Sequence, residues 1–121
     1  MAKDNERKIH ELKDKIKEFC DARDWDQFHN PKDLAIGIIT EASELLEHFR
    51  FKSENEVKSI LNSNKRNEIN EEIADILFFI LRFAQRYDVD LSQELEEKIK
   101  KSALKYPIEK AKGSNQKYTE L

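Results

Sequence analysis

Two pairs of acids interrupt the two most apolar helical patterns of this chain, and each pair has a spacing of i to i+3. The pairs are Glu41 with Glu44 and Glu72 with Asp75. Residues at i and i+3 lie about one turn apart on the same helix face, so each pair presents two carboxylates in one direction. No Lys or Arg is interleaved, and stacked like charges beside apolar residues destabilise a helix. The pattern therefore predicts two helices that share a site completed by a cation from solution.

The composition favours an all-α fold around these pairs. Only 2 Gly and 2 Pro occur in 121 residues, so tight turns are few, and Glu, Lys, Leu and Ile are abundant. A chain of this length is enough for one modest domain with its own core and too short for two ordinary ones. We therefore expect a single all-α domain over residues 1–121, a four-helix bundle whose exterior is heavily charged.

The spacing of apolar residues predicts helices over residues 4–22, 31–51, 66–87 and 91–104, plus a short one capped by Ser53. Asn30 and Pro31 form a favourable N-cap and first helical position. Ser92 is the candidate cap of the last helix, and residues 106–121 should be an irregular basic tail. The expected core positions of the second helix are Leu34, Ile38, Ala42, Leu45 and Phe49, and those of the fourth are Leu95, Ile99 and Leu104.

The third predicted helix is apolar around most of its circumference, with Ile76 to Leu81 as the longest apolar run. Such a helix must be central or lie in a subunit interface, because one neighbouring layer cannot cover every side of it. We therefore expect a homo-oligomer.

Several classes of protein are excluded or disfavoured. The formal net charge of -3 gives no argument for nucleic-acid binding. The longest apolar run is far shorter than the roughly 20 residues that span a bilayer, and the charged N-terminal stretch lacks a signal peptide's apolar run. Cys20 is alone, so it forms no intrachain disulfide, and we expect it to face the core. These features predict a cytoplasmic protein with no nucleic-acid or membrane partner.

Oxygen ligands indicate which cation the acid pairs would hold. One pair alone is usually a solvated helix face, but two pairs beside the most apolar stretches rarely arise by accident. Mg²⁺ and Mn²⁺ prefer carboxylate oxygens, whereas di-iron bundles use a Glu-x-x-His spacing that is absent here. His10, His29 and His48 match no zinc spacing. We interpret His10 and His48 as surface or capping residues.

Two further features leave alternatives open. The polar segment RDWDQFHN contains Trp25, Phe28 and His29, which either plug the end of a bundle or stack on a ligand. Residues 98–118 carry many lysines and Glu109 as their only acid. Lysines near a carboxylate-bound metal suit a triphosphate, while a solvated basic tail is the alternative. The motif GxxxxGK[ST] is absent, which excludes a P-loop mechanism.

Together these motifs resemble a known family. The sequence contains RDWDQFHNP, ExxE at Glu41 and Glu44, ExxD at Glu72 and Asp75, and KYPIEKAKG followed by QKYTEL. This combination is similar to the MazG-like all-α nucleotide pyrophosphohydrolases, particularly their dCTP pyrophosphatase branch. The resemblance implies Mg²⁺-dependent hydrolysis of a nucleoside triphosphate, dCTP or a related deoxynucleotide, to the monophosphate and pyrophosphate. It also implies tight homodimers that complete the bundle, paired into a tetramer as a dimer of dimers.

The resemblance assigns roles by position. It makes Glu41, Glu44, Glu72 and Asp75 the ligands of Mg²⁺, for which Mn²⁺ can substitute. Glu44 or Glu41 would orient or deprotonate the attacking water. Trp25 matches a base-stacking Trp of the family, while Phe51 and Phe79 stand where the branch has Trp and Tyr, and Ile16 and Ser102 replace its His and Asn. These changes place selectivity for cytosine in question, but not the chemistry.

Lys105 and Lys117 are the candidates to neutralise the charge of the leaving pyrophosphate.

Two other interpretations compete with this one. A related enzyme of the same fold would act on dUTP or on a phosphoribosyl nucleotide. A helical interaction module without activity would use its aromatic residues to bind a partner protein and would leave the acids at the surface.

Overall fold

The computed structural model describes residues 1–121 and is helical, with no strand. Its main helices are α1 (Ile9–Asp21), α2 (Pro31–Glu47), α3 (Glu54–Leu61), α4 (Arg66–Arg86), α5 (Leu91–Lys105) and α6 (Ile108–Ala111). Three short 3₁₀ turns complete the list, η1 (Asp4–Glu6), η2 (Asp26–Phe28) and η3 (Tyr118–Glu120). The predicted all-α class is confirmed. None of these helices is long and apolar enough to span a membrane.

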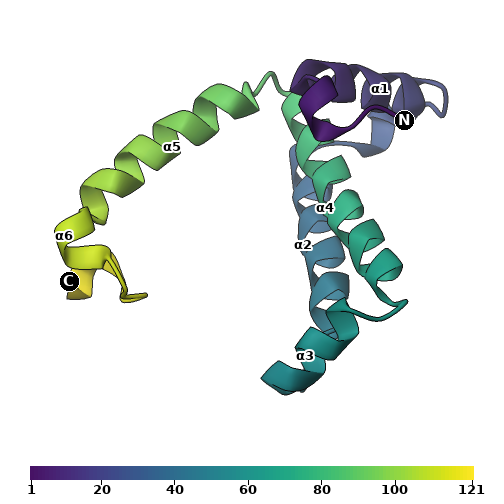
Figure 1. Ribbon diagram of the computed structural model, residues 1–121. Coiled ribbons are helices and arrows are strands. Elements are labelled where there is room, and N and C mark those ends of the chain that lie inside the picture. Colours follow the sequence, from purple (N-terminus) through teal and green to yellow (C-terminus); the bar gives the residue numbers. More distant parts are fainter. The chain divides into compact units, whose positions relative to one another are not determined.

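The chain forms two compact units, Met1–Asp88 and Val89–Leu121. In the first unit α2 and α4 run side by side, as Figure 1 shows, and α1 and α3 also pack against α4. The α2–α4 pair is the most extensive contact between helices, so the two elements that carry the acid pairs are neighbours. Completion of a four-helix bundle by a second copy stays a prediction.

Local chemistry sets the ends of the helices. The Asn30 side chain accepts a hydrogen bond from Asp33 N at 2.8 Å, with Pro31 at the first position, as expected. Ser53 caps α3 in a capping box. The prediction that the second helix reaches Phe51 was wrong, because the helix ends at Glu47 and Phe51 has a positive φ of 62°. Residues of this backbone conformation cannot continue a right-handed helix.

The first helix also begins later than predicted. Residues 4–6 form the separate turn η1, and α1 starts at Ile9 after Lys8, whose backbone N–H donates to Glu11 at 2.9 Å. The extended backbone of Arg7 separates the two elements. The start of α4 at Arg66 agrees with the prediction, and its end at Arg86 lies one residue earlier than predicted.

The core of the first unit is small, and its residues come from α1, α2 and α4. Its buried apolar residues are Cys20, Leu34, Ile69, Leu81 and Ala84. The expectation that Cys20 faces the core is confirmed. Ala42 was wrongly placed on the core face, because it is exposed while the neighbouring Glu41 is half-buried. A charged side chain, Arg82, is fully buried in the same region.

Helices α2 and α4 approach closely at Gly37. A Cβ atom built on Gly37 would lie 2.6 Å from the ring of Phe79, well inside van der Waals contact. The missing side chain therefore lets the Phe79 ring lie against the α2 backbone.

Gly37→Ala is expected to destabilise the protein, although Gly→Ala in a helix interior normally stabilises by about 0.5–1 kcal/mol. Overpacking against Phe79 costs about 1–3 kcal/mol, which exceeds that gain. Chemical denaturation measures the effect, and Phe79→Leu supplies the control, since the smaller side chain should reduce the penalty in the double variant. A more stable single variant would contradict the close approach.

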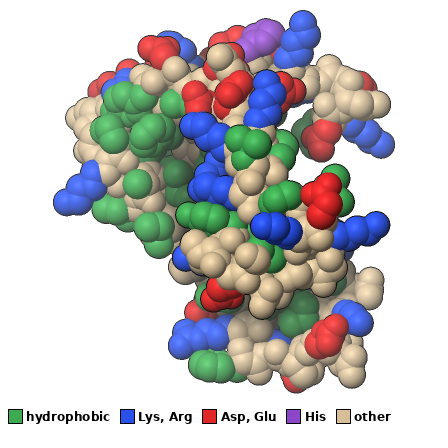
Figure 2. Space-filling model, turned by 90° about the vertical axis from the view of Figure 1, so that its left-hand side faces the viewer, with side chains coloured by type: hydrophobic (Ala, Val, Ile, Leu, Met, Phe, Trp, Pro, Cys, Tyr) green, Lys and Arg blue, Asp and Glu red, His purple; other side chains and the backbone are tan.

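Many apolar side chains of the first unit stay exposed. On α4, Ile73 and Leu77 are 51% and 45% exposed, and on α2, Ile36 and Ile39 are 50% and 71% exposed. Figure 2 shows hydrophobic side chains gathered in patches between charged ones, including a broad patch at the upper left. The helix that the sequence predicts to be apolar around most of its circumference thus presents an uncovered apolar side.

The second unit consists of α5, α6 and η3. Helix α5 is capped by Asp90, whose side chain accepts from Gln93 N at 3.0 Å, so the assignment of Ser92 as cap was wrong. Leu95, Ile99 and Leu104 are 62%, 59% and 84% exposed and do not point into a core within this unit. The unit contains no second long helix that could cover them. The tail predicted to be irregular contains the short elements α6 and η3.

Candidate metal centre

The structure brings all four predicted acids together. Glu41 and Glu44 on α2 and Glu72 and Asp75 on α4 each offer a carboxylate oxygen, and these oxygens lie within 4.8 Å of one another. Because α2 and α4 pack side by side, their two i, i+3 pairs meet across the helix interface. We call these four residues the acid cluster.

Glu41 is the most perturbed member of the acid cluster. Its Oε2 atom is buried and has no hydrogen-bond partner. Burial, followed by the hydrogen bond and charge of Glu44 and the charges of Asp75 and Glu72, raises the pKa of Glu41 to about 7. A buried oxygen without a partner is costly and calls for a donor or a cation.

Glu72 is held between like charges and a histidine. Burial and Glu44 raise the pKa of the Glu72 carboxyl, while His48 acts in the opposite direction. His48 Nε2 lies 3.6 Å from Glu72 Oε1, and the two side chains are 15% and 20% exposed. His48 is the C-cap residue of α2, which agrees with its interpretation as a surface or capping residue, but its contact with Glu72 was not predicted.

The residues present fit a hard divalent cation. Four carboxylates within one small volume, one of them with an orphaned buried oxygen, match the oxygen ligands that Mg²⁺ and Mn²⁺ take. No lysine or arginine forms a salt bridge with any of the four. A bound cation would both neutralise the mutual repulsion and satisfy Glu41.

Trp25 and Phe79 belong to one row of aromatic rings. Trp25 packs edge-on against Phe19 with ring centroids 5.5 Å apart, Phe19 against Phe78 at 6.0 Å, and Phe78 against Phe79 at 5.4 Å. The row joins the loop between α1 and α2 to helix α4. Trp25 is half-buried, so it both packs on this row and keeps an exposed edge.

Phe51 lies apart from this row. It follows the C-terminal end of α2, whereas Trp25 precedes the N-terminal end, so the length of the helix separates them. Phe51 is 90% exposed and its ring lies 4.6 Å from the Arg50 guanidinium carbon. One chain therefore does not bring Trp25, Phe51 and Phe79 into a single slot.

The two predicted phosphate-binding lysines belong to the second unit. Lys105 ends α5, and its Nζ lies 4.8 Å from the ring centroid of Tyr118. Lys117 precedes η3, whose first residue is Tyr118. Tyr106 and Tyr118 pack edge-on at 6.0 Å, so the unit holds the KYP and KYTEL segments together.

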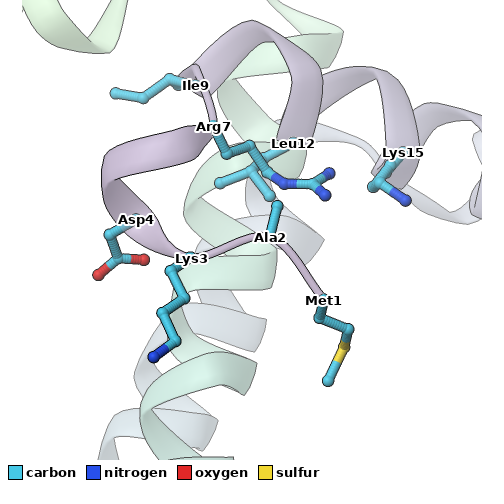
Figure 3. A pocket seen from close by; sticks show the side chains of 8 residues that line it. All are labelled: Met1, Ala2, Lys3, Asp4, Arg7, Ile9, Leu12 and Lys15. Carbon is cyan, nitrogen blue, oxygen red and sulfur yellow. The ribbon is translucent and has the colours of Figure 1, made fainter.

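A cavity of about 430 Å³ lies between the N-terminal segment and α1 (Figure 3), and no residue of the acid cluster lines it. Its lining combines apolar and basic side chains with one acid, from Met1, Ala2, Lys3, Asp4, Arg7, Ile9, Leu12 and Lys15. None of these residues is a predicted site residue.

Sequence reasoning missed two residues near the site. His48 follows Glu44 by four positions and Glu41 by seven, so helical spacing alone places it on their face. Arg82 is the only basic residue between Ile73 and Ala84, and it follows Asp75 by two turns. A single basic residue within the most apolar stretch of this helix was the available signal.

Comparison with known proteins identifies the family. A model of the MazG-like family matches residues 36–121, which include the acid cluster and run through both units. Over 105 residues, or 86% of its length, the chain is 36% identical to dCTP pyrophosphatase 1 of Mus musculus and 35% identical to that of Homo sapiens. It spans only 62% of the length of each of these relatives.

A solved structure is similar over nearly its whole length. The chain superposes on a pyrophosphatase from Archaeoglobus fulgidus with a TM-score of 0.79 and 33% identity. The match covers 88% of this chain and 99% of that one. The motifs, the fold and these matches lead to one conclusion, that this chain belongs to the MazG-like family.

Proposed function

We propose that this protein is a Mg²⁺-dependent nucleoside triphosphate pyrophosphohydrolase. Its substrate would be a deoxynucleoside triphosphate, dCTP or a related one, and its products the monophosphate and pyrophosphate. The observation that carries the proposal is the acid cluster, four carboxylates from two facing helices within 4.8 Å. The relatives named as pyrophosphatases support the reaction type.

The cluster residues have distinct tasks in this proposal. Glu41, Glu44, Glu72 and Asp75 hold the metal. Mg²⁺, or Mn²⁺ in its place, would supply positive charge at the phosphate oxygens and favour ionisation of the attacking water. Glu44 is exposed to solvent while Glu41 is half-buried, so Glu44 is better placed to orient the water and accept its proton. Glu41, whose pKa is raised to about 7, is the alternative base.

The balance of the reaction is simple. Water supplies an oxygen to the phosphorus, an anhydride P–O bond breaks, and pyrophosphate leaves with the bond's electron pair. The proton from water passes to the accepting carboxylate. Lys105 and Lys117 would neutralise charge on the leaving group.

A nucleotide panel with pyrophosphate detection tests the proposed function. We expect release of pyrophosphate from dCTP or a related deoxynucleotide in the presence of Mg²⁺, and none with chelator. Preference for dUTP or for a phosphoribosyl nucleotide would assign a related activity of the same fold. Absence of hydrolysis with every nucleotide, together with no effect of Mg²⁺ on stability, would favour the interaction module.

Trp25 is the proposed contact for the base. Stacking of a base on an aromatic ring contributes about 1–3 kcal/mol, so Trp25→Ala should weaken substrate binding about tenfold or more. Steady-state kinetics measure this as a higher KM. A lower melting temperature with unaltered kinetics would instead make Trp25 a structural plug, and Phe28→Ala in the same loop is the matched control.

We also propose a homo-oligomer, a dimer or a dimer of dimers. Ile39, Ile73 and Leu77 leave an apolar surface on α2 and α4 uncovered, and burial of such area stabilises by about 25 cal/mol per Å². Light scattering at micromolar concentration is expected to give at least twice the 14.4 kDa of one chain. A folded, soluble monomer would contradict this prediction.

A further inference from the structure

A fully buried arginine connects the Trp25 loop to the helix that carries half of the acid cluster. Arg82 on α4 has no exposed surface. Its Nε donates to His29 Nδ1 at 2.8 Å, its Nη2 to Asp26 Oδ1 at 2.6 Å and its Nη1 to Gln85 Oε1 at 2.6 Å. All three guanidinium nitrogens therefore have acceptors. We call Arg82 with these acceptors the Arg82 clamp.

Additional bonds hold the same loop to the end of α4. Arg86 Nη1 lies 3.0 Å from Asp26 Oδ2, so the Asp26 carboxylate binds two arginines. The Tyr87 hydroxyl donates to the His29 carbonyl oxygen at 3.2 Å. Residues more than fifty positions apart in the chain are thus joined by charge-assisted bonds.

Ionisation states agree with this geometry. The hydrogen bond from Arg82, with the charges of Arg86 and Arg82, lowers the pKa of Asp26 despite an opposing desolvation effect. Burial first, then the charges of Arg82 and Arg86, lowers the pKa of His29. A neutral His29 leaves Nδ1 free to accept from Arg82 and carries its proton on Nε2.

The clamp determines where Trp25 lies. Asp26 follows Trp25 directly, and the His29 ring packs edge-on against the indole at 5.8 Å. Arg82 binds both Asp26 and His29 from α4, and Phe19 also packs edge-on against the indole at 5.5 Å. Asp75 precedes Arg82 by about two helical turns on the same helix. One rigid element therefore holds both the loop of Trp25 and part of the acid cluster.

We propose that Arg82 is a positioning residue, which fixes Trp25 relative to the acid cluster and so sets the register between the base and the phosphates of the substrate. This inference rests on the proposed function. In this proposal Arg82 itself touches neither the base nor the phosphates of the substrate. The planar guanidinium group of Arg82 donates to three acceptors at once, and a lysine ammonium cannot match this geometry.

The test compares Arg82→Met with the wild type and with Arg66→Met, which removes an exposed arginine at the other end of α4. Trp25 is the only tryptophan, so its fluorescence reports on the loop alone. Arg82→Met should increase acrylamide quenching of Trp25 and raise the KM for the triphosphate about tenfold, with kcat changed much less. Arg66→Met should change neither quantity.

Asp26→Asn is the milder variant, because asparagine keeps the shape of the side chain and an Oδ1 acceptor for Arg82 at a site that is 52% exposed. It should show the same changes at smaller amplitude, and the double variant with Arg82→Met should be less affected than the sum of the two. Arg82→Lys should recover only part of the wild-type KM. Kinetics and quenching equal to the wild type, with only a lower melting temperature, would make the clamp merely structural and overturn the inference.

The quenching measurement separates this inference from the proposed function. A wild-type protein without pyrophosphate release would refute the function. In that case unchanged quenching of Trp25 in Arg82→Met would refute the clamp as well, whereas increased quenching would support its hold on the loop.

Discussion

Replacing Glu44 or Glu72 by glutamine is expected to lower pyrophosphate release about a hundredfold or more, while the metal-free protein stays as stable or becomes more stable. Each amide keeps the shape of the side chain but loses one charged oxygen of the acid cluster. Glu44 raises the pKa of both Glu41 and Glu72, so its charge disfavours their ionisation. Removing that charge relieves repulsion in the absence of metal.

Two matched controls lie on the same helices. Glu47→Gln on α2 removes an exposed acid that pairs only with Arg50 at 3.2 Å, and Glu71→Gln on α4 removes the exposed neighbour of Glu72. Both should retain full activity, because neither residue belongs to the acid cluster and surface ion pairs contribute little to stability. Thermal melts beside the pyrophosphate assay separate the two effects. Full activity of Glu44→Gln or Glu72→Gln would remove that residue from the proposed site.

The opposite responses of activity and stability follow from how the site is built. Like charges beside a core are retained at a cost to the metal-free fold, a trade that is common at active sites. The same conflict made the site visible in the sequence. Two unpaired acid pairs inside apolar helical patterns violate the local rule that like charges at i, i+3 repel, and such violations tend to mark functional positions.

Local signals explain why much of the fold could be predicted. Asn30 with Pro31 and Ser53 with Glu56 specify helix starts through bonds within a few residues, and the structure contains both. The sequence also predicted that the helices of the two acid pairs, α2 and α4, face each other, because both pairs need a shared cation. Helix ends were less predictable, because the positive φ of Phe51 carries no composition signal of the kind that Gly provides.

Long-range polar contacts were beyond the sequence pattern. Nothing in the spacing of Asp26 and His29 predicts that their partner is Arg82, since the bonds join segments distant in the chain. His48 was discounted because it matched no zinc spacing, yet its place on the Glu41 and Glu44 face brings it to Glu72. Leu95 and Ile99 were assigned inward from periodicity, which gives a face but not its partner.

The pH dependence of Glu41 gives a second large effect. Burial, with Glu44 as the next cause, raises the pKa of Glu41 in the folded protein to about 7, above its ordinary value of 4.5. Between these two values the folded state binds more protons than the unfolded state. The contribution of the Glu41 carboxyl to the free energy of unfolding is therefore fully present below pH 4.5 and is lost as the pH rises through 7.

Comparison with Glu41→Gln isolates the contribution of the acid cluster, because groups outside the cluster titrate equally in both proteins. Without metal, the variant should gain stability over the wild type as the pH rises from 4.5 to 7, and the difference should level off above that range. Thermal melts in chelator across these pH values measure it. A difference independent of pH would show that Glu41 ionises normally.

Mg²⁺ should reverse the order of stability of the wild type and Glu41→Gln. A ligand that binds only the folded state stabilises it by mass action, and a carboxylate must lose its proton to bind a cation. Saturating Mg²⁺ should therefore raise the melting temperature of the wild type more at pH 8 than at pH 5.5, and raise that of Glu41→Gln much less at either pH. Because Glu41 Oε2 is buried without a partner, an equal Mg²⁺ shift in both proteins would mean that the cation binds elsewhere.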